Sequence, residues 1–197
     1  MTANDIGTRK PRADAERNRL RLMAIAKVAF ADKGTSASLD DIARAAGVGI
    51  ATLYRHFPSR EALIGQLYEN EGEQLANAAT RLSQAEPPLE AIRQWLMMFI
   101  DYLSTKQIMA EVLSLLGPGA DRICAVSGDK LIEAMGRLLT NAKLKGDVCR
   151  DVEPLDLLMA IGGASNLNHA PNWEKGAVRL VDIIIAGLTQ RSDAAAL

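Results

Sequence analysis

Hydrogen-bonding and basic side chains gather in residues 38–57, SLDDIARAAGVGIATLYRHF. Ser38 is a good helix N-cap, and Asp41, three residues later, completes an approximate capping box. Apolar residues then recur at helical spacing until Gly47, which supplies the positive φ that ends a helix. Val48 fills the corner, and a second short helix is expected over about residues 49–57. The spacing therefore predicts a helix-turn-helix.

The second of these helices has two different faces. Leu53 and Phe57 are expected to point inward, and the outward and flanking positions hold Ile50, Ala51, Thr52, Tyr54, Arg55 and His56. A short helix with small and hydrogen-bonding side chains at its N-terminal end suits the major groove of DNA. The alternative is an ordinary helical hairpin, in which Leu53, Tyr54 and Phe57 are only packing residues.

The run from about residue 20 to residue 67, and above all DDIARAAGVGIATLYRHFPSREAL, resembles the TetR/AcrR family of transcriptional regulators. The order of its elements carries the likeness: an Ala-Gly-Val corner, Thr-Leu-Tyr, His-Phe, then Ser-basic-Glu opening a helix. The resemblance implies an all-α fold with an N-terminal three-helix DNA-binding domain and a C-terminal helical ligand-binding and dimerisation domain. It also implies a homodimeric repressor that a small-molecule effector releases from a palindromic double-stranded DNA operator.

Matching this sequence to the family position by position gives a predicted set of DNA contacts. Phosphate contacts are expected from Ser38, Tyr54, His56 and Arg60, and base contacts from Ile50, Ala51 and Thr52, with Arg44 and Arg55 as further contacts. Two positions depart from a frequent family pattern, because Gly49 stands where serine is common and Ile50 where a polar residue is common. Gly49 is expected to cap weakly or to allow close approach to the DNA backbone. Ile50 and Ala51 suit a thymine methyl group, so Arg44 or Arg55 is expected to carry any guanine preference.

Composition and charge agree with a helical protein that meets DNA at one end. The chain has 197 residues, of which 48% are hydrophobic and only 4% aromatic, and this favours helix-on-helix packing. Residues 1–60 hold 11 Lys and Arg against 6 Asp and Glu, whereas residues 61–197 hold 12 against 18. A basic first third on an acidic remainder is expected where one end binds phosphates. Without an apolar secretory segment or a membrane-length apolar run, we expect a cytoplasmic protein with no membrane partner.

The predicted organisation has four parts: a flexible basic arm at 1–12, the DNA-binding domain at 13–72, the effector and dimerisation domain at 73–190, and a tail at 191–197. Asp14 is expected to cap a first helix that runs to about Lys33, and Ser59 to cap a long one that links head to body. Beyond Glu86-Pro87-Pro88, helices are expected at about 89–105, 107–116, 121–145, 154–168 and 173–190.

The resemblance places an effector cavity among the methionines, aromatics and amides of the middle helices, for a mid-sized, mostly apolar ligand. Its candidate lining is Trp95, Phe99, Tyr102, Met109, Met135, Asn166 and His169. The same side chains make an equally good core. The last two helices are the candidate dimer interface, through Leu158, Ile161, Gly162, Ser165, Val181, Ile184 and Leu188. The alternative for these is again a buried core.

Enzyme chemistry has little support in this sequence. His56 and His169 are its two histidines, and HExxH, GxGxxG, GxxxxGK[ST] and GxSxG motifs are all missing. We therefore expect no catalytic residues, no metal and no cofactor. Cys124 and Cys149 are expected to be buried packing residues, or else a redox pair. The rival function is a helical small-molecule binding or interaction protein that does not read DNA specifically.

Overall fold

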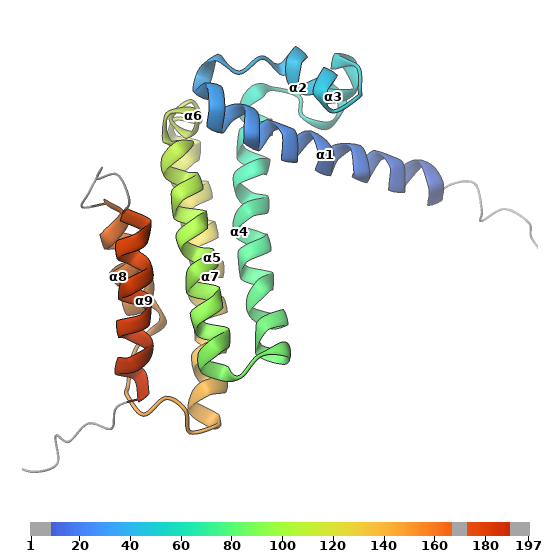
Figure 1. The fold of residues 1–197 in the computed structure, drawn as a ribbon. Coiled ribbons are helices and arrows are strands. Elements are labelled where there is room, and N and C mark those ends of the chain that lie inside the picture. Colours follow the sequence, from blue (N-terminus) through green and yellow to red (C-terminus); the bar gives the residue numbers. More distant parts are fainter. Residues whose placement is uncertain (1–8, 167–172, 190–197) are drawn as a thin grey trace, which may run out of the picture. The chain divides into compact units, whose positions relative to one another are not determined.

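The computed structural model describes residues 9–166 and 173–189, with the backbone alone described at 9–12, 108, 118, 120–126 and 166. Every regular element in these ranges is a helix (Figure 1). The chain divides into two compact units. Unit 1 comprises Met1–Tyr68 and Ile108–Ala120, and unit 2 comprises Glu69–Gln107 and Asp121–Leu197.

Unit 1 is built on the helix α1 (Arg9–Lys33), followed by the 3-10 turn η1 (Gly34–Ser36), α2 (Leu39–Ala45) and α3 (Ile50–His56). The first residues of α4 (Arg60–Ala85) and the short α6 (Ala110–Ser114) complete it. In Figure 1, α2 and α3 lie side by side on α1, and each of these three helices contacts the other two. On α1, the apolar side chains of Leu22, Ala26 and Phe30 are fully buried. They pack in one core with Ile42, Leu53, Phe57, Leu63 and Ile64.

The first helix begins earlier than its sequence predicts. It begins at Arg9, whereas the cap was expected at Asp14, so Arg9, Lys10 and Arg12 lie in a helix and not in a flexible arm. The reason is that Pro11 is only the third helical residue. Proline is tolerated in the first turn, where its missing N–H has no intrahelical partner.

Unit 2 contains the rest of α4, most of α5 (Pro88–Ile108) and of α7 (Pro118–Leu144), and the helices α8 (Pro154–Asn166) and α9 (Trp173–Thr189). Its helix α5 contacts elements on both sides. The indole Nε1 of Trp95 donates a 2.9 Å hydrogen bond to the Leu75 carbonyl of α4. From another face of α5, Arg93 Nε lies 3.0 Å from Asp182 Oδ1 of α9. The helices α8 and α9 lie side by side (Figure 1).

Prolines begin three of the later helices. Pro88, Pro118 and Pro154 each occupy the first position of a helix, where their fixed φ suits the helix and no N–H is lost. Gly117 adopts a φ of +53° directly before α7, which begins at Pro118, three residues before the helix expected at 121–145.

The division into units differs from the predicted boundary. The structure changes unit inside α4, at Tyr68–Glu69, and returns Ile108–Ala120 to unit 1. A boundary drawn along the sequence at residue 72 could not include that return of the chain. Within the ranges described, no helix is long and apolar enough to cross a membrane.

Candidate nucleic-acid interface

The turn between α2 and α3 has the predicted geometry. Ser38 Oγ accepts the backbone N–H of Asp41 at 3.3 Å, which confirms Ser38 as the N-cap of α2. Gly47 has a φ of +66°, and it donates its N–H to the Arg44 carbonyl while Val48 donates to the Ala43 carbonyl, both at 3.0 Å. These two bonds form a Schellman motif, which closes the C-terminus of α2 and starts the turn.

The helix α3 presents one face to the core and the other to solvent. Leu53 is fully buried, as is Phe57, which ends the helix. Ala51, Tyr54 and Arg55 are exposed, and Tyr54 retains 47% of its accessible surface. Ile50, Thr52 and His56 are half-buried at the margins. The predicted inward and outward faces are therefore both observed.

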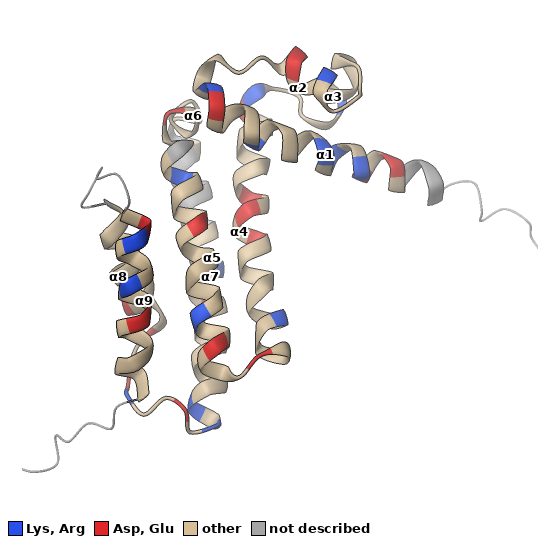
Figure 2. Ribbon diagram, in the orientation of Figure 1, with Lys and Arg blue, Asp and Glu red and all other residues tan. Residues whose placement is uncertain are grey.

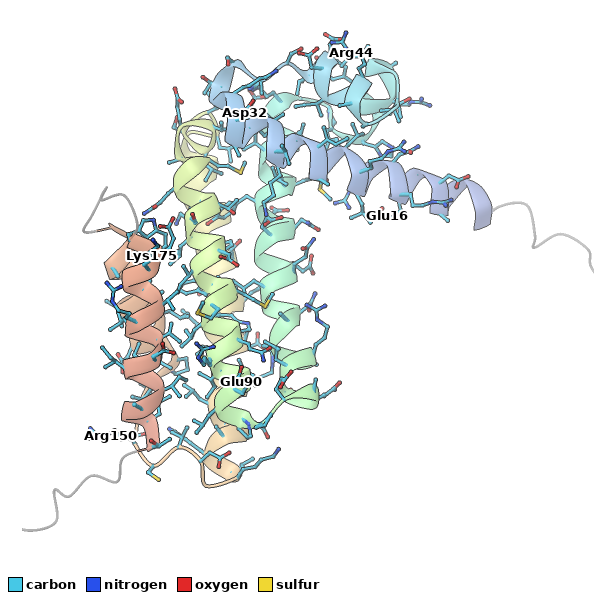
Figure 3. The ribbon with its side chains drawn as sticks, in the orientation of Figure 1. Glu16, Asp32, Arg44, Glu90, Arg150 and Lys175 are labelled. Carbon is cyan, nitrogen blue, oxygen red and sulfur yellow. The ribbon has the colours of Figure 1, made fainter. Side chains whose placement is uncertain are left out.

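The guanidinium groups of two arginines contact residues of their own helices. Arg55 Nη2 donates to Thr52 Oγ1 at 2.7 Å, and its Nε lies 3.4 Å from the Ala51 carbonyl. Arg44 pairs with Asp41 one turn earlier, and Figure 3 shows it pointing away from the rest of unit 1. A guanidinium carries five N–H donors, so both side chains keep donors for a second partner.

The basic side chains of α1 also have partners within unit 1. Arg17 pairs with Asp14, Arg19 with Glu16, and Arg21 donates to Asn18. Figure 2 shows that the acids of these pairs come before their arginines along α1, and the acids of α2 likewise precede its arginine. Local pairing of this kind partly neutralises the charges of α1 and of α2, whereas α3 carries Arg55 and His56 and no acid.

Arg60 was predicted to contact a phosphate, but its guanidinium has partners inside unit 1. Nη1 donates to the Ala37 carbonyl at 2.6 Å and Nη2 to the Thr35 carbonyl at 2.8 Å. Its carbon Cζ lies 5.0 Å from the centre of the Phe30 ring. These contacts favour a role in holding the fold together.

Gly49 is the N-cap of α3, with a φ of −75° and a ψ of 152° that any residue can adopt. A Cβ built at this position would have no neighbour within 4 Å. The described part of unit 1 therefore does not require glycine at this position. Of the two roles predicted for Gly49, close approach to the DNA backbone is the one that would require it.

In unit 2 the predicted effector residues are only partly brought together. Trp95, Phe99 and Tyr102 form a buried row along α5, with stacked ring centroids 5.8 and 6.1 Å apart. Met135 of α7 is fully buried in the same unit, whereas Met109 belongs to unit 1. The side chain of Asn166 and the whole of His169 lie outside the described part of the chain.

An open depression of about 590 Å³ lies elsewhere in unit 2, along α7. It is lined by Ile132, Glu133, Gly136, Arg137, Thr140, Asn141, Leu144 and Pro154. None of these residues was predicted to bind a ligand, because an exposed helix face of mixed polarity carries no distinctive sequence signal.

The predicted dimer surface needs correction. Leu158, Ile161, Ser165, Val181 and Leu188 are buried within the single chain, so they cannot offer a surface to a second copy. Gly162 and Ile184 are half-buried. The large apolar side chains exposed on the two helices are Leu155, Met159 and Ile183, which retain 45%, 65% and 67% of their accessible surface. Both α8 and α9 are apolar on several faces, so periodicity alone could not separate the inner face from the outer one.

The prediction of a buried packing residue is wrong for Cys149, and the alternative of a redox pair stays a prediction. Cys149 is exposed and free, and the side chain of Cys124 is outside the described set. Cys149 lies in the loop between α7 and α8, where its backbone N–H donates to the Leu188 carbonyl.

Comparison with known proteins places both parts of the chain. Residues 22–67 match the family described as bacterial regulatory proteins of the tetR family, and residues 87–190 match the C-terminal domain of SbtR-like transcriptional regulators. The second match alone spans more than half of the chain. No curated protein matches this chain.

Solved structures agree with these matches. A TetR transcriptional regulator from Streptomyces coelicolor is 36% identical, with a TM-score of 0.77 over 87% of this chain and 98% of that one. A TetR transcription regulatory protein from Mycobacterium vanbaalenii is 28% identical, with a TM-score of 0.75 over 91% of this chain and 99% of that one.

The chain belongs to the TetR family of transcriptional regulators. It has the all-helical fold of that family, with an N-terminal helix-turn-helix domain and a helical C-terminal domain. It is a DNA-binding regulator of transcription and not an enzyme, as the sequence predicts.

Proposed function

We propose that this regulator is a homodimeric repressor, which binds a palindromic operator and is released from it by a small, mostly apolar effector. The observation that carries the operator-binding part is the two-faced α3. Its buried Leu53 and Phe57 fix it to unit 1 while Ala51, Tyr54 and Arg55 are exposed. A short helix presented in this way suits the major groove.

The contacts divide between bases and phosphates. Ile50 and Ala51 offer apolar groups to a thymine methyl, Thr52 offers a hydroxyl, and the guanidinium groups of Arg44 and Arg55 suit the O6 and N7 of guanine. Phosphates are contacted by the Tyr54 hydroxyl, by His56 and by the hydroxyl of Ser38. Ser38 can serve because its oxygen accepts from Asp41 and its own hydrogen is left to donate.

Dimerisation follows from the energetics of one short recognition helix, which reads too few base pairs to be selective alone. The exposed Leu155, Met159 and Ile183 give α8 and α9 an apolar outer face. Half-buried Gly162 and Ile184 lie on the same two helices, and glycine permits close helix contact. A second copy that packs on this face would remove it from water and set the spacing of the two recognition helices.

Effector release is assigned to unit 2. The stacked Trp95, Phe99 and Tyr102 offer a flat, apolar surface, with Met135 as an adaptable neighbour. These side chains are buried, so an effector must bind a conformation in which they separate. It shifts the regulator away from DNA only through its higher affinity for that conformation.

The proposal is tested by selecting bound sequences from a random double-stranded DNA pool at near-physiological salt. We expect an enriched palindrome with two half-sites at one fixed spacing. A folded, ligand-free protein that enriches no sequence would contradict the proposal and support the rival function without specific DNA reading. The selected duplex then serves to screen apolar compounds for release.

A further inference from the structure

Arg60 occupies a position that is unfavourable for a cation. It is the first residue of α4, directly after Ser59, whose Oγ accepts the backbone N–H of Ala62 at 3.1 Å. The N-terminus of a helix carries partial positive charge, so an arginine there is repelled by the helix dipole. Its presence calls for compensation by other groups in the molecule or by a bound anion.

The compensation is found within unit 1. The carbonyls of Ala37 and Thr35 each accept one N–H from Arg60, at 2.6 and 2.8 Å, across 23 and 25 residues of sequence. The Phe30 ring covers one side of the same guanidinium at 5.0 Å. Phe30 is fully buried and Ala37 is 2% exposed, so these two partners belong to the core, whereas Thr35 is exposed.

Residues 35–37, which Arg60 holds, lead directly into the helix-turn-helix formed by α2 and α3. Ala37 precedes Ser38, the N-cap of α2, and α2 is packed against α3. On its other side the same segment meets α6, since η1 contacts α6 and a Cβ on Gly34 would lie 3.2 Å from Glu111 Oε2. The loop therefore contacts α1 and α6, and the Arg60 guanidinium ties it to α4.

We propose that Arg60 is a positioning residue for operator reading. Its forked guanidinium ties the carbonyls of residues 35 and 37 to the start of α4, and so fixes α2 and α3 on the long helix. Arginine suits this task because its planar head donates in two fixed directions while it stacks on a ring. The role rests on the operator binding proposed above, and it replaces the phosphate contact predicted from sequence.

Salt dependence separates the two roles in the full-length protein. If Arg60 neutralises a phosphate, Arg60→Met weakens specific and non-specific binding alike. It also reduces the magnitude of the negative slope of log K against log salt by about 0.9. Arg60→Lys would then restore most of the affinity. If Arg60 instead positions α2 and α3, both variants lose about tenfold in operator affinity. They keep wild-type non-specific affinity and salt slope.

A second measurement needs no operator. In amide hydrogen exchange, Arg60→Lys and Arg60→Met should exchange faster than wild type over residues 34–46, including the Asp41 N–H that Ser38 holds. Exchange in α8 and α9 should be unchanged. Arg17→Met is the matched control, because Arg17 lies in the same unit but is exposed and pairs with Asp14 on its own helix.

The outcomes are distinguishable from those of the proposed function. Unchanged exchange over residues 34–46, or rescue of operator affinity by lysine with a slope that responds to charge, would overturn the positioning role. A wild-type protein that selects no operator would contradict the proposed function instead. Faster exchange in the Arg60 variants would then still establish the tie to α4.

Discussion

The guanidinium of Arg55 donates from Nη2 to the hydroxyl oxygen of Thr52, 2.7 Å away and three residues earlier on the exposed side of α3. Because the hydroxyl oxygen of Thr52 accepts this bond, its hydrogen is left to donate outward, toward an acceptor such as guanine N7 or thymine O4. The two residues therefore present a joint donor surface, and each holds the other in place.

This pairing predicts coupled effects on base preference. Thr52→Ala and Arg55→Ala should each relax selectivity at one or two base pairs, with losses of about 1–3 kcal/mol at the preferred base. The double variant should lose less than the two single losses combined, because each single variant already disturbs the other residue. Affinities for operators with single base changes check this. Fully additive losses would show that the two side chains act independently.

Tyr54 should act on the DNA backbone and not on the bases. Removing its exposed hydroxyl in Tyr54→Phe should weaken binding to every sequence by about fivefold, the equivalent of one hydrogen bond. Preference among bases and the salt slope should not change, because the hydroxyl is uncharged. Fluorescence anisotropy on operator and scrambled duplexes measures both quantities. Unchanged affinity for all duplexes would remove Tyr54 from the phosphate contacts.

The dimer face should be sensitive to charge at its exposed apolar residues. Met159→Glu and Ile183→Glu should shift the protein toward monomer, since each would place an unpaired carboxylate in an apolar interface. Sedimentation velocity at micromolar concentration gives the distribution. Leu144→Glu is the matched control, because Leu144 is 83% exposed and lies on α7, outside the proposed face. If all three variants keep the wild-type mass, α8 and α9 do not form the interface through these residues.

Much of this architecture could be predicted from sequence because local rules determine it. Ser38 and Gly47 each have a conformational role that few other residues could fill, and both occur where the sequence places them. Pro88 and Pro154 begin helices within one residue of their expected starts for the same reason. The faces of α3 followed from the spacing of Leu53 and Phe57 alone.

The remaining features depend on contacts between distant parts of the chain. Arg60 has its partners 23 and 25 residues away, and nothing in its local sequence separates a phosphate contact from an internal one. Val181 and Ile183 are both apolar and only two positions apart, yet one is fully buried and the other 67% exposed. Which side of α9 packs inward is decided by α8, and this is not a property of the α9 sequence.

Gly49 offers a test of how closely α3 approaches DNA. Its backbone suits serine and a Cβ meets no neighbour, so Gly49→Ser should cap α3 better and raise Tm by about 1 °C. If the glycine serves close approach to a phosphate, the same variant should bind operator more weakly despite its higher stability. Calorimetry and anisotropy on the same samples separate these effects. A variant that gains stability and keeps its affinity would leave Gly49 without a role in binding.

Glu61 should make the stability of α4 depend on pH. Its pKa is held below the ordinary 4.5, chiefly by the backbone N–H at the helix start, and further by Ser59 and Arg60. A lowered folded-state pKa stabilises the protein above about pH 4.5, and this contribution is lost as pH falls through the folded value. Glu61→Gln should therefore lower Tm at pH 7, and the difference should shrink toward pH 3. Glu73→Gln, exposed in the middle of α4, is the control. An equal difference at both pH values would contradict the assignment.

The most direct test of the regulator as a dimeric reader of DNA compares three duplexes at one near-physiological salt concentration. These are the selected palindrome, one half-site of it, and a scrambled sequence of equal length. We expect two chains per palindrome and an affinity at least about 10³-fold above that for the scrambled duplex, with the half-site far weaker than the palindrome. Equal affinity for all three duplexes would contradict sequence-specific reading by paired recognition helices.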